Sequence, residues 1–371
     1  MPLLGLIAEP PFDPFSWSGS SAYLFRALQR QGVISGACEV SLSRFRDAVE
    51  KGRALSLPML RWKERYHSSV PRFGALTRKA AEILGEHQDV SGVLQIGAWF
   101  SAGVTTKIPC FGYHDGNAAL RYRYYGRGLL SERARLAHLR WERSVYMALT
   151  GIFVMSEWLA DSFVRDFDIP RSKVHVVGGG INFEKLPELA ERSWSTPRYL
   201  LVGKDFERKG GKYLLEAFKI VRRTLPDAEL ILVGPSLAIE HPGVKCVGYL
   251  SKCNPADMAR LDRFFCTATA MVLPSVYEPF GISLLEGMAY GLPCIAADRC
   301  ALPEIVRHGE TGVIARAEDP VSLADAMIEL GKDPRSAATM GAAGRSRVES
   351  HFTWTAVTAK MKMILSGTYE V

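Results

Sequence analysis

The sequence predicts an α/β protein with two domains. Short apolar runs that are typical of buried strands alternate with amphipathic helical patterns along most of the 371 residues. The chain is long enough to form two hydrophobic cores. A polar segment with two prolines, residues 185–197, separates two such strand-helix series and is typical of an interdomain linker.

The composition indicates a globular protein of the cytoplasm. Hydrophobic residues make up 47% of the chain and charged residues 23%, which is ordinary for a soluble protein. The segment 1–8 has no basic lead and reads as a first buried strand, not a signal peptide. No apolar run approaches the ~20 residues that cross a bilayer. The seven cysteines are scattered without a C-x-x-C pair, so we expect neither a disulfide framework nor a zinc site.

Positive charge is concentrated in one part of the chain. The net charge is +7, and residues 51–150 carry 16 Lys and Arg against 7 Asp and Glu. The densest part is 121–127, followed by Arg133, Arg135, Arg140 and Arg143. This pattern indicates a solvated face, an anionic membrane contact or a site for a phosphate-linked acceptor. No nucleic-acid-binding motif accompanies it, so we expect no nucleic-acid partner.

The first series begins with the strand at 1–8 and a long loop. The following helix is predicted to turn Ala22, Leu24, Phe25 and Leu28 inward and to be capped by Ser20 or Ser21. Gly19 leaves room for a ligand beside the backbone, although a glycine before a helix is also ordinary turn chemistry.

Further strands are expected at 93–96, 110–113, 151–155 and 174–177, with helices at 129–149 and 156–167. His114 and Asp115 follow the second of these strands. The imidazole can transfer a proton near neutral pH, or it can form a structural hydrogen bond with Asp115.

Asp166 and Asp168 spell D-x-D, which we interpret as a helix exit and not as a metal site. Residues 40–90 are hard to interpret: Arg53, Arg61, Lys63, Arg65 and Arg72 form either an acceptor loop or plain surface.

The second series contains a basic, glycine-rich loop. Strands are expected at 198–202, 229–234 and 244–250, with helices at 213–223 and 255–265. Between the first strand and helix, Lys204, Arg208 and Lys209 stand among Gly203, Gly210 and Gly211. Cations and a permissive backbone suit a diphosphate, although basic loops are also common on surfaces.

The most informative stretch is 270–297, which reads as strand, loop, short helix and strand; three more helices follow at 322–330, 335–348 and 352–364. Such α/β units bind ligands at the carboxyl ends of their strands. Glu278 lies in the loop and Glu286 on the helix. Ser283-x-x-Glu286 has capping-box spacing, which explains Glu286 without a ligand but leaves Glu278 unexplained. Alternatively, both carboxylates accept hydrogen bonds from sugar hydroxyls, while amides of 281–283 face a phosphate.

The run from Glu278 to Glu286 resembles the E-x(7)-E signature of glycosyltransferase family 4, whose members retain anomeric configuration and use nucleotide sugars. Residues 302–314 also resemble this family. The resemblance implies the GT-B fold, which has two Rossmann-like domains that face each other across a central cleft. We therefore expect domains at 1–190, joined by a C-terminal helix at about 353–371, and at 191–352.

The resemblance also implies roles for individual residues. Glu278 would contact the transferred sugar, Lys209 would grip the phosphates, and His114 would act near the reaction centre as base or positioner. Lys204 stands where the family more often has arginine, and Arg208 could partly substitute. The remaining donor-binding residues implied are Glu286 at the ribose, the backbone of Gly281 and Ile282, Tyr249 in the nucleobase pocket, and Gly19 near the diphosphate.

By this resemblance, the protein would transfer a sugar from a nucleotide-diphosphate donor to a glycan, lipid-linked or small-molecule acceptor in cell-envelope biosynthesis. No metal or other cofactor is expected, and peripheral contact with an anionic membrane is implied by charge alone. Three alternatives remain: another GT-B enzyme such as a phosphorylase, a non-catalytic sugar-nucleotide binding protein, and, last, an RNA-binding protein.

Overall fold

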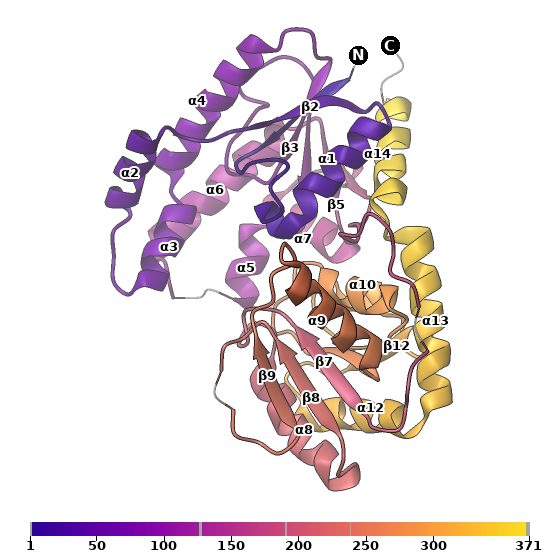
Figure 1. The fold of residues 1–371 in the computed structure, drawn as a ribbon. Helices are drawn as coiled ribbons and strands as arrows, with labels where there is room; N and C mark the ends of the chain where they lie inside the picture. The colour runs from indigo at the N-terminus through magenta and orange to yellow at the C-terminus, as the bar shows by residue number, and fades with distance from the viewer. Residues whose placement is uncertain (1, 126–127, 190, 238, 369–371) are drawn as a thin grey trace. The chain divides into compact units, whose positions relative to one another are not determined.

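The computed structural model describes residues 2–125, 128–189, 191–237 and 239–368 (Figure 1). Contacts divide the chain into two compact units, Met1–Gly180 with Trp354–Val371, and Ile181–Thr353. The boundary expected at residue 190 lies outside the described residues, ten positions after the division at Gly180. Each unit is described by itself.

The first unit contains a six-stranded sheet in the order β2-β1-β3-β4-β5-β6, and all paired neighbours are parallel. Its strands are β1 (Leu3–Ile7), β2 (Ile34–Glu39), β3 (Gly92–Ile96), β4 (Cys110–His114), β5 (Gly151–Val154) and β6 (Val174–Val176). Every residue of β1, β3, β4 and β5 is buried, as expected for strands covered on both faces.

The helices of this unit are α1 (Ser20–Arg30), α2 (Arg44–Arg53), α3 (Met59–His67), α4 (Val70–Glu86), α5 (Ala118–Tyr124), α6 (Glu132–Ala148), α7 (Glu157–Phe167) and α14 (Trp354–Thr368), with short 3-10 turns at Ser16–Gly19 and Arg171–Lys173. The four inward positions predicted for α1 are confirmed, because Ala22, Leu24, Phe25 and Leu28 are all buried. The predicted serine cap is wrong. Gly19 is the N-cap, and Ser21 instead donates a hydrogen bond to the Ser16 carbonyl.

The second unit also contains a six-stranded parallel sheet, in the order β12-β11-β10-β7-β8-β9. Its strands are β7 (Arg198–Val202), β8 (Glu229–Val233), β9 (Val244–Gly248), β10 (Ala270–Leu273), β11 (Cys294–Ala297) and β12 (Gly312–Ala315). Its helices are α8 (Gly211–Thr224), α9 (Pro255–Thr267), α10 (Ile282–Ala289), α11 (Leu302–Ile305), α12 (Pro320–Lys332) and α13 (Pro334–His351).

The core of the second unit lies between its sheet and helices α8 and α12. Tyr199, Phe218, Leu232 and Met327 are among its buried members. The Tyr199 hydroxyl donates a hydrogen bond to the Met327 carbonyl over 2.5 Å, so its polar group is satisfied inside the core. Both units are therefore Rossmann-like, with parallel sheets and helical crossovers. Among the described residues, no helix combines the length and apolarity needed to cross a bilayer.

Helix α14 completes the first unit from the far end of the chain. Trp354 is 4% exposed and contacts Tyr113 of β4 edge-on, with ring centroids 6.3 Å apart. The Gln31 side chain at the end of α1 donates hydrogen bonds to Thr358 Oγ1 over 2.7 Å and to the Thr355 carbonyl over 3.0 Å. Figure 1 shows this yellow helix beside α1.

Candidate active site

The candidate site of the second unit lies where its strand order reverses. Strand β7 comes first in this sheet but lies between β10 and β8, so the chain continues to one side and later returns to the other. In open parallel sheets, ligands bind at the carboxyl ends of the strands at this point. Two loops meet there: 203–210, which follows β7, and 274–281, which follows β10.

Backbone contacts hold these two loops together. The Val276 N–H donates a hydrogen bond to the Arg208 carbonyl over 2.9 Å. Gly210 has φ of +73°, and a Cβ added there would lie 1.9 Å from the Pro274 carbonyl oxygen. No other residue type fits this approach, so the glycine predicted to give the phosphate loop its freedom also permits its contact with the β10 loop.

Lys209 and Glu278 form a buried ion pair between the two loops. Each residue is 7% exposed, and Lys209 Nζ donates to Glu278 Oε2 over 2.6 Å. The Ser275 hydroxyl donates to the same oxygen over 3.3 Å. The structure thus brings together two residues that are 69 positions apart in sequence and that the family resemblance assigns to phosphate and sugar.

Arg208 adds a second cation to this pair. Its Nη1 donates to the Tyr277 carbonyl over 2.9 Å and lies 3.4 Å from Glu278 Oε2. Burial by itself would raise the pKa of Glu278, but Lys209 and Arg208 outweigh it and lower the pKa. Glu278 is therefore a carboxylate at neutral pH, and its fixed charge holds both cations in place.

Lys204 pairs with Tyr249, which lies just after β9. The ammonium nitrogen is 4.1 Å from the centre of the Tyr249 ring, a cation–π contact. Among the described residues, no carboxylate lies within 4.0 Å of that nitrogen. Tyr249 is 47% exposed, so one face of this pair is open to solvent. A predicted phosphate ligand and a residue of the predicted nucleobase pocket are thus neighbours.

The capping-box interpretation of Glu286 is wrong. Gly281 is the N-cap of α10, with φ of +108°, and no side chain caps the helix. Ser283 therefore lies inside the first turn, two positions after the N-cap, and cannot cap the helix. Glu286 is 4% exposed and instead forms an ion pair with Lys252 from the segment after β9. The first N–H groups of α10 have no partner within the helix, which leaves them available to an anion.

His114 and Gly19 lie in the first unit. The His114 ring is 2% exposed and packs against Tyr146 and Phe163, with centroids at 5.2 and 5.4 Å. Its Nε2 has no hydrogen-bond partner within the described part of the chain, and burial lowers the pKa of His114 to about 3. Gly19 has φ of +86° and follows Trp17 and Ser18, which are also left-handed. Glu9 steadies this turn by accepting a 2.7 Å hydrogen bond from the Trp17 N–H.

The basic stretch that begins at residue 121 is partly internal. Arg121 forms a two-bond ion pair with Glu64, Arg123 contacts Asp166 at 2.7 Å, and Arg143 contacts Asp168 at 3.5 Å. Arg127 lies outside the described residues.

The interpretation of the D-x-D sequence as a helix exit is confirmed, because α7 ends at Phe167 and Asp168 is its left-handed C-cap.

Sequence reasoning missed three residues of the site. Ser275 holds Glu278, Lys252 holds Glu286, and the Ser283 hydroxyl is buried at the start of α10 with no hydrogen-bond partner among the residues described. The capping-box spacing drew attention to Ser283 for the wrong reason. Nothing in the local sequence distinguishes Lys252 from other surface lysines, because its partner is 34 positions away.

The fold and the two loops are those expected from the resemblance to glycosyltransferases, and comparison of the sequence with known proteins gives matches to the same class. Residues 196–333 match the family described as "Glycosyl transferases group 1". The chain is 29% identical over 227 residues to glycogen synthase of Mycobacterium tuberculosis (strain ATCC 25618 / H37Rv), covering 58% of this chain and 54% of that protein. It is 30% identical over 236 residues to D-inositol 3-phosphate glycosyltransferase of Streptomyces avermitilis, covering 57% and 51%. The chain thus spans about half the length of these relatives.

Solved structures share this fold at low sequence identity. Sucrose-phosphate synthase from Thermosynechococcus elongatus has a TM-score of 0.71 at 19% identity, with 99% of both chains covered. Anabaena Alr3699/HepE, solved in complex with UDP, has a TM-score of 0.70 at 14% identity, covering 99% and 100%. The expected GT-B fold class, with two Rossmann-like domains, is confirmed.

Proposed function

We propose that this protein is a retaining glycosyltransferase that moves a sugar from a nucleoside-diphosphate sugar to a glycan, lipid-linked or small-molecule acceptor. The observation that carries the proposal is the buried Lys209–Glu278 pair, with Arg208, at the strand-order reversal of a group 1 glycosyltransferase domain. Relatives named as glycogen synthase and as a GDP-mannose-dependent mannosyltransferase support a role in polysaccharide or envelope glycoconjugate synthesis.

The main contribution expected of the protein is to stabilise the leaving diphosphate. Negative charge grows on it as the glycosidic bond breaks, and preorganised donors stabilise that charge best. Lys209 and Arg208 are held by Glu278, so they need no rearrangement when the charge develops. Lys204 and the first N–H groups of α10 add further donors. In this proposal these groups neutralise the diphosphate without a metal ion.

In this proposal the two signature carboxylates bind the two sugar rings of the donor. Glu278 would accept hydrogen bonds from hydroxyls of the transferred sugar, and Glu286 from the ribose diol. Tyr249 would face the nucleobase, for which its exposed ring offers a stacking surface. Gly281 and Ile282 would present their N–H groups to the phosphate.

For His114 we propose positioning and not proton transfer. With a pKa of about 3, its imidazole is neutral throughout the physiological range and is a poor proton acceptor. The His114 ring is held between the rings of Tyr146 and Phe163, so in this proposal it fixes the position of the chain at the end of β4. Gly19 would let the acceptor or the diphosphate approach the backbone of the first unit.

A donor screen followed by product analysis tests the function. Thermal unfolding should shift upward with one of the uridine, guanosine or adenosine diphosphates, and the corresponding nucleotide sugar should be consumed. Nuclear magnetic resonance of the product should show the donor's anomeric configuration. An inverted product would reject the retaining mechanism, and use of sugar phosphates in place of nucleotide sugars would favour a phosphorylase.

Lys209→Ala tests the role of the cation. We expect turnover to fall about 10²-fold or more, as when an enzyme loses one anion-stabilising donor. Lys212→Ala is the matched control, because Lys212 is three positions away on α8 and its ammonium lies 4.6 Å from the centre of the Tyr213 ring. Both variants are assayed well below their unfolding temperatures, since removal of Lys209 also leaves Glu278 with one cation fewer. Wild-type turnover in Lys209→Ala would refute the phosphate role.

A further inference from the structure

The hairpin formed by α2 and α3, residues 43–68, exposes an unusual number of large apolar side chains. Figure 1 shows it at the edge of the first unit. Six of the exposed large apolar residues of the protein lie here: Phe45, Val49, Leu55, Leu57, Met59 and Leu60. Leu57 is 85% exposed and Phe45 81%. Exposed apolar groups clustered in this way mark an interaction surface.

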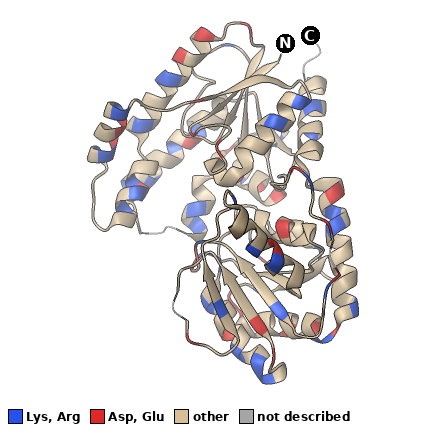
Figure 2. Ribbon diagram, in the orientation of Figure 1, with Lys and Arg blue, Asp and Glu red and all other residues tan. Residues whose placement is uncertain are grey.

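Charge in the same hairpin is separated by sign. All seven of its basic residues are exposed: Arg44, Arg46, Lys51, Arg53, Arg61, Lys63 and Arg65. Its three acidic residues point inward or are paired. Asp47 contacts Lys51 at 2.7 Å, Glu50 contacts Arg53 at 2.8 Å, and Glu64 is bound by Arg121. Figure 2 shows the basic positions along both helices. The outward surface therefore combines apolar side chains with positive charge.

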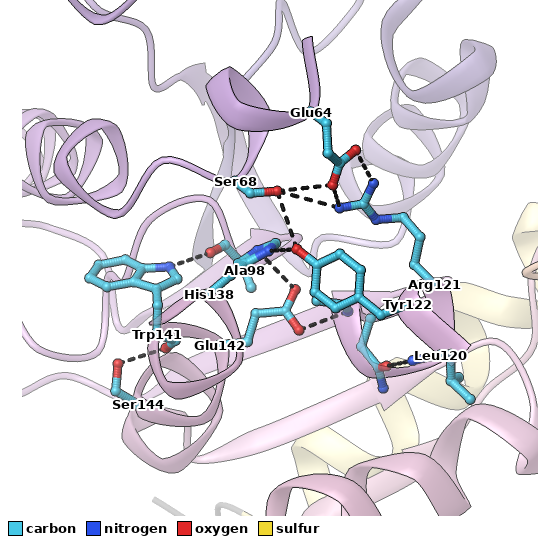
Figure 3. A network of polar contacts seen from close by, with 12 residues as sticks. Glu64, Ser68, Ala98, Leu120, Arg121, Tyr122, His138, Trp141, Glu142 and Ser144 are labelled. Atoms are coloured by element: carbon cyan, nitrogen blue, oxygen red, sulfur yellow. Dashed lines mark hydrogen bonds and ion pairs between the residues drawn. The ribbon is translucent and has the colours of Figure 1, made fainter. Parts of the chain in front are cut away.

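Inward contacts hold the hairpin in this orientation. Trp62 donates a 2.9 Å hydrogen bond to the Lys51 carbonyl, and Tyr66 donates to Asp47, so α3 packs on α2 through one face. A second face of α3 is fixed by the network in Figure 3, in which Glu64 binds Arg121 of α5 and Ser68 lies 3.3 Å from the Tyr122 hydroxyl. The faces that carry Met59, Leu60 and Lys63 are left to solvent.

We propose that this hairpin docks the protein on an anionic lipid bilayer. Apolar side chains would enter the boundary between headgroups and acyl chains, while the surrounding Lys and Arg contact acidic headgroups. A bilayer fits better than a protein partner because the basic residues surround the apolar ones from both helices and no exposed acid interrupts them. The proposal gives the transferase suggested above a lipid-linked acceptor at a membrane surface, and on that point it depends on the proposed function.

Vesicle sedimentation tests the proposal independently of catalysis. Wild-type protein should bind vesicles of equal parts phosphatidylcholine and phosphatidylglycerol, and should bind pure phosphatidylcholine much more weakly. The apolar variant Leu55→Ser/Leu57→Ser/Leu60→Ser should bind about 100-fold more weakly, because each leucine loses its transfer energy. The charge variant Arg44→Glu/Arg61→Glu/Lys63→Glu should lose about 100-fold or more, since each basic residue contributes roughly five-fold.

Matched controls carry the same changes on other surfaces. Val104→Ser/Val321→Ser/Met363→Ser changes exposed apolar residues elsewhere, and Lys219→Glu/Arg223→Glu/Arg263→Glu makes the same change in net charge on the second unit. Both controls should bind vesicles like the wild type. All variants should keep the thermal shift with nucleoside diphosphate, which separates loss of docking from failure of the donor site.

Two outcomes overturn the proposal: wild-type protein that does not bind the acidic vesicles, and hairpin variants that bind them as well as the controls do. Analytical ultracentrifugation tests the main alternative, in which the hairpin surface binds a second copy of the chain. A dimer that the hairpin variants abolish, together with absence of vesicle binding, would assign this surface to a second copy of the chain.

Discussion

Two buried glutamates of this protein are in opposite electrostatic surroundings. Glu278 has two cations at its carboxylate, which lower its pKa in spite of burial. Glu142 on α6 accepts a 2.9 Å hydrogen bond from the Ala118 N–H and lies 3.7 Å from His138, and no Lys or Arg among the described residues forms an ion pair with it. Burial raises its pKa to about 7. The first side chain is held ionised, and the second is poised to lose its proton near neutral pH.

Glu142 should make the first unit less stable as the pH rises. Its pKa in the folded state exceeds the usual value of 4.5, so its contribution to stability is complete below about pH 4.5 and is lost as the pH rises to about 7. Glu142→Gln keeps the acceptor for Ala118 but cannot ionise. At pH 8 it should be more stable than the wild type by roughly 3 kcal/mol, since a pKa unit corresponds to about 1.4 kcal/mol.

Chemical denaturation between pH 5 and pH 8 measures this difference. Glu132→Gln, on an exposed position of the same helix, is the control and should match the wild type at each pH. His138 acts in the opposite direction: burial lowers its pKa to about 4, so its contribution is lost as the pH falls from about 6.5 towards 4. A constant difference between Glu142→Gln and the wild type at all pH values would contradict the assignment.

At the level of residues, the sequence identified the charged members of the candidate site but not their partners. Lys209 and Glu278 were visible in two motifs, but only the folded loops place their side chains 2.6 Å apart. Glu286 was visible too, and its explanation as part of a capping box failed because Gly281 occupies the N-cap. A motif specifies which residues matter locally, and it carries no information on contacts between distant segments.

The elements that carry the site are two loops that touch backbone to backbone at Gly210 and Pro274. Gly210→Ala should therefore weaken donor binding and lower the free energy of unfolding by more than the ~1–2 kcal/mol of a left-handed alanine, because its Cβ would collide with the Pro274 carbonyl. Isothermal calorimetry with the nucleoside diphosphate and urea unfolding would measure the two effects.

Gly309 supplies the matched control for this change. It also has a positive φ, +76°, but among the described residues no atom beyond Gly309 and its chain neighbours lies within 4 Å of an added Cβ. Gly309→Ala should show the strain of the left-handed backbone alone and leave donor affinity unchanged. Equal effects at the two positions would mean that the approach to Pro274 is unimportant.

Most strands and long helices were predicted from the sequence, because buried parallel strands are short apolar runs with clear ends. Residues 40–90 could not be interpreted, and for residues 44–67 the structure gives the reason. Helices α2 and α3 turn Glu50 and Glu64 inward and expose Phe45 and Leu60, so their apolar residues do not mark the buried side. The pattern that normally identifies a helix face is thus reversed there.

On the scale of the whole molecule, the first unit is built from two distant parts of the chain. Trp354 begins the returning helix and covers Gly180, where an added Cβ would lie 2.3 Å from the indole. Trp354→Ala should lower the stability of the first unit by about 3–5 kcal/mol, as for other large aromatic deletions from a core. Urea unfolding followed by circular dichroism measures the loss.

The same helix offers an exposed control. Met363 is 69% exposed, and Met363→Ala should change stability by less than about 0.5 kcal/mol. If Trp354→Ala is equally mild, helix α14 does not contribute to the core of the first unit. The returning helix was expected from the family resemblance, since nothing in residues 352–364 by themselves indicates which unit they join.

This discontinuity has a consequence for biosynthesis. A ribosome makes β1 to β6 first, yet it must translate the entire second unit before α14 can cover Gly180 and reach Gln31. Until then the nascent chain exposes the apolar surface that Trp354 later protects, and this interval is when chaperones or neighbouring polysomes have access to it. The second unit is contiguous, so it can fold as it emerges, and the unit that is translated first is then the last to be completed.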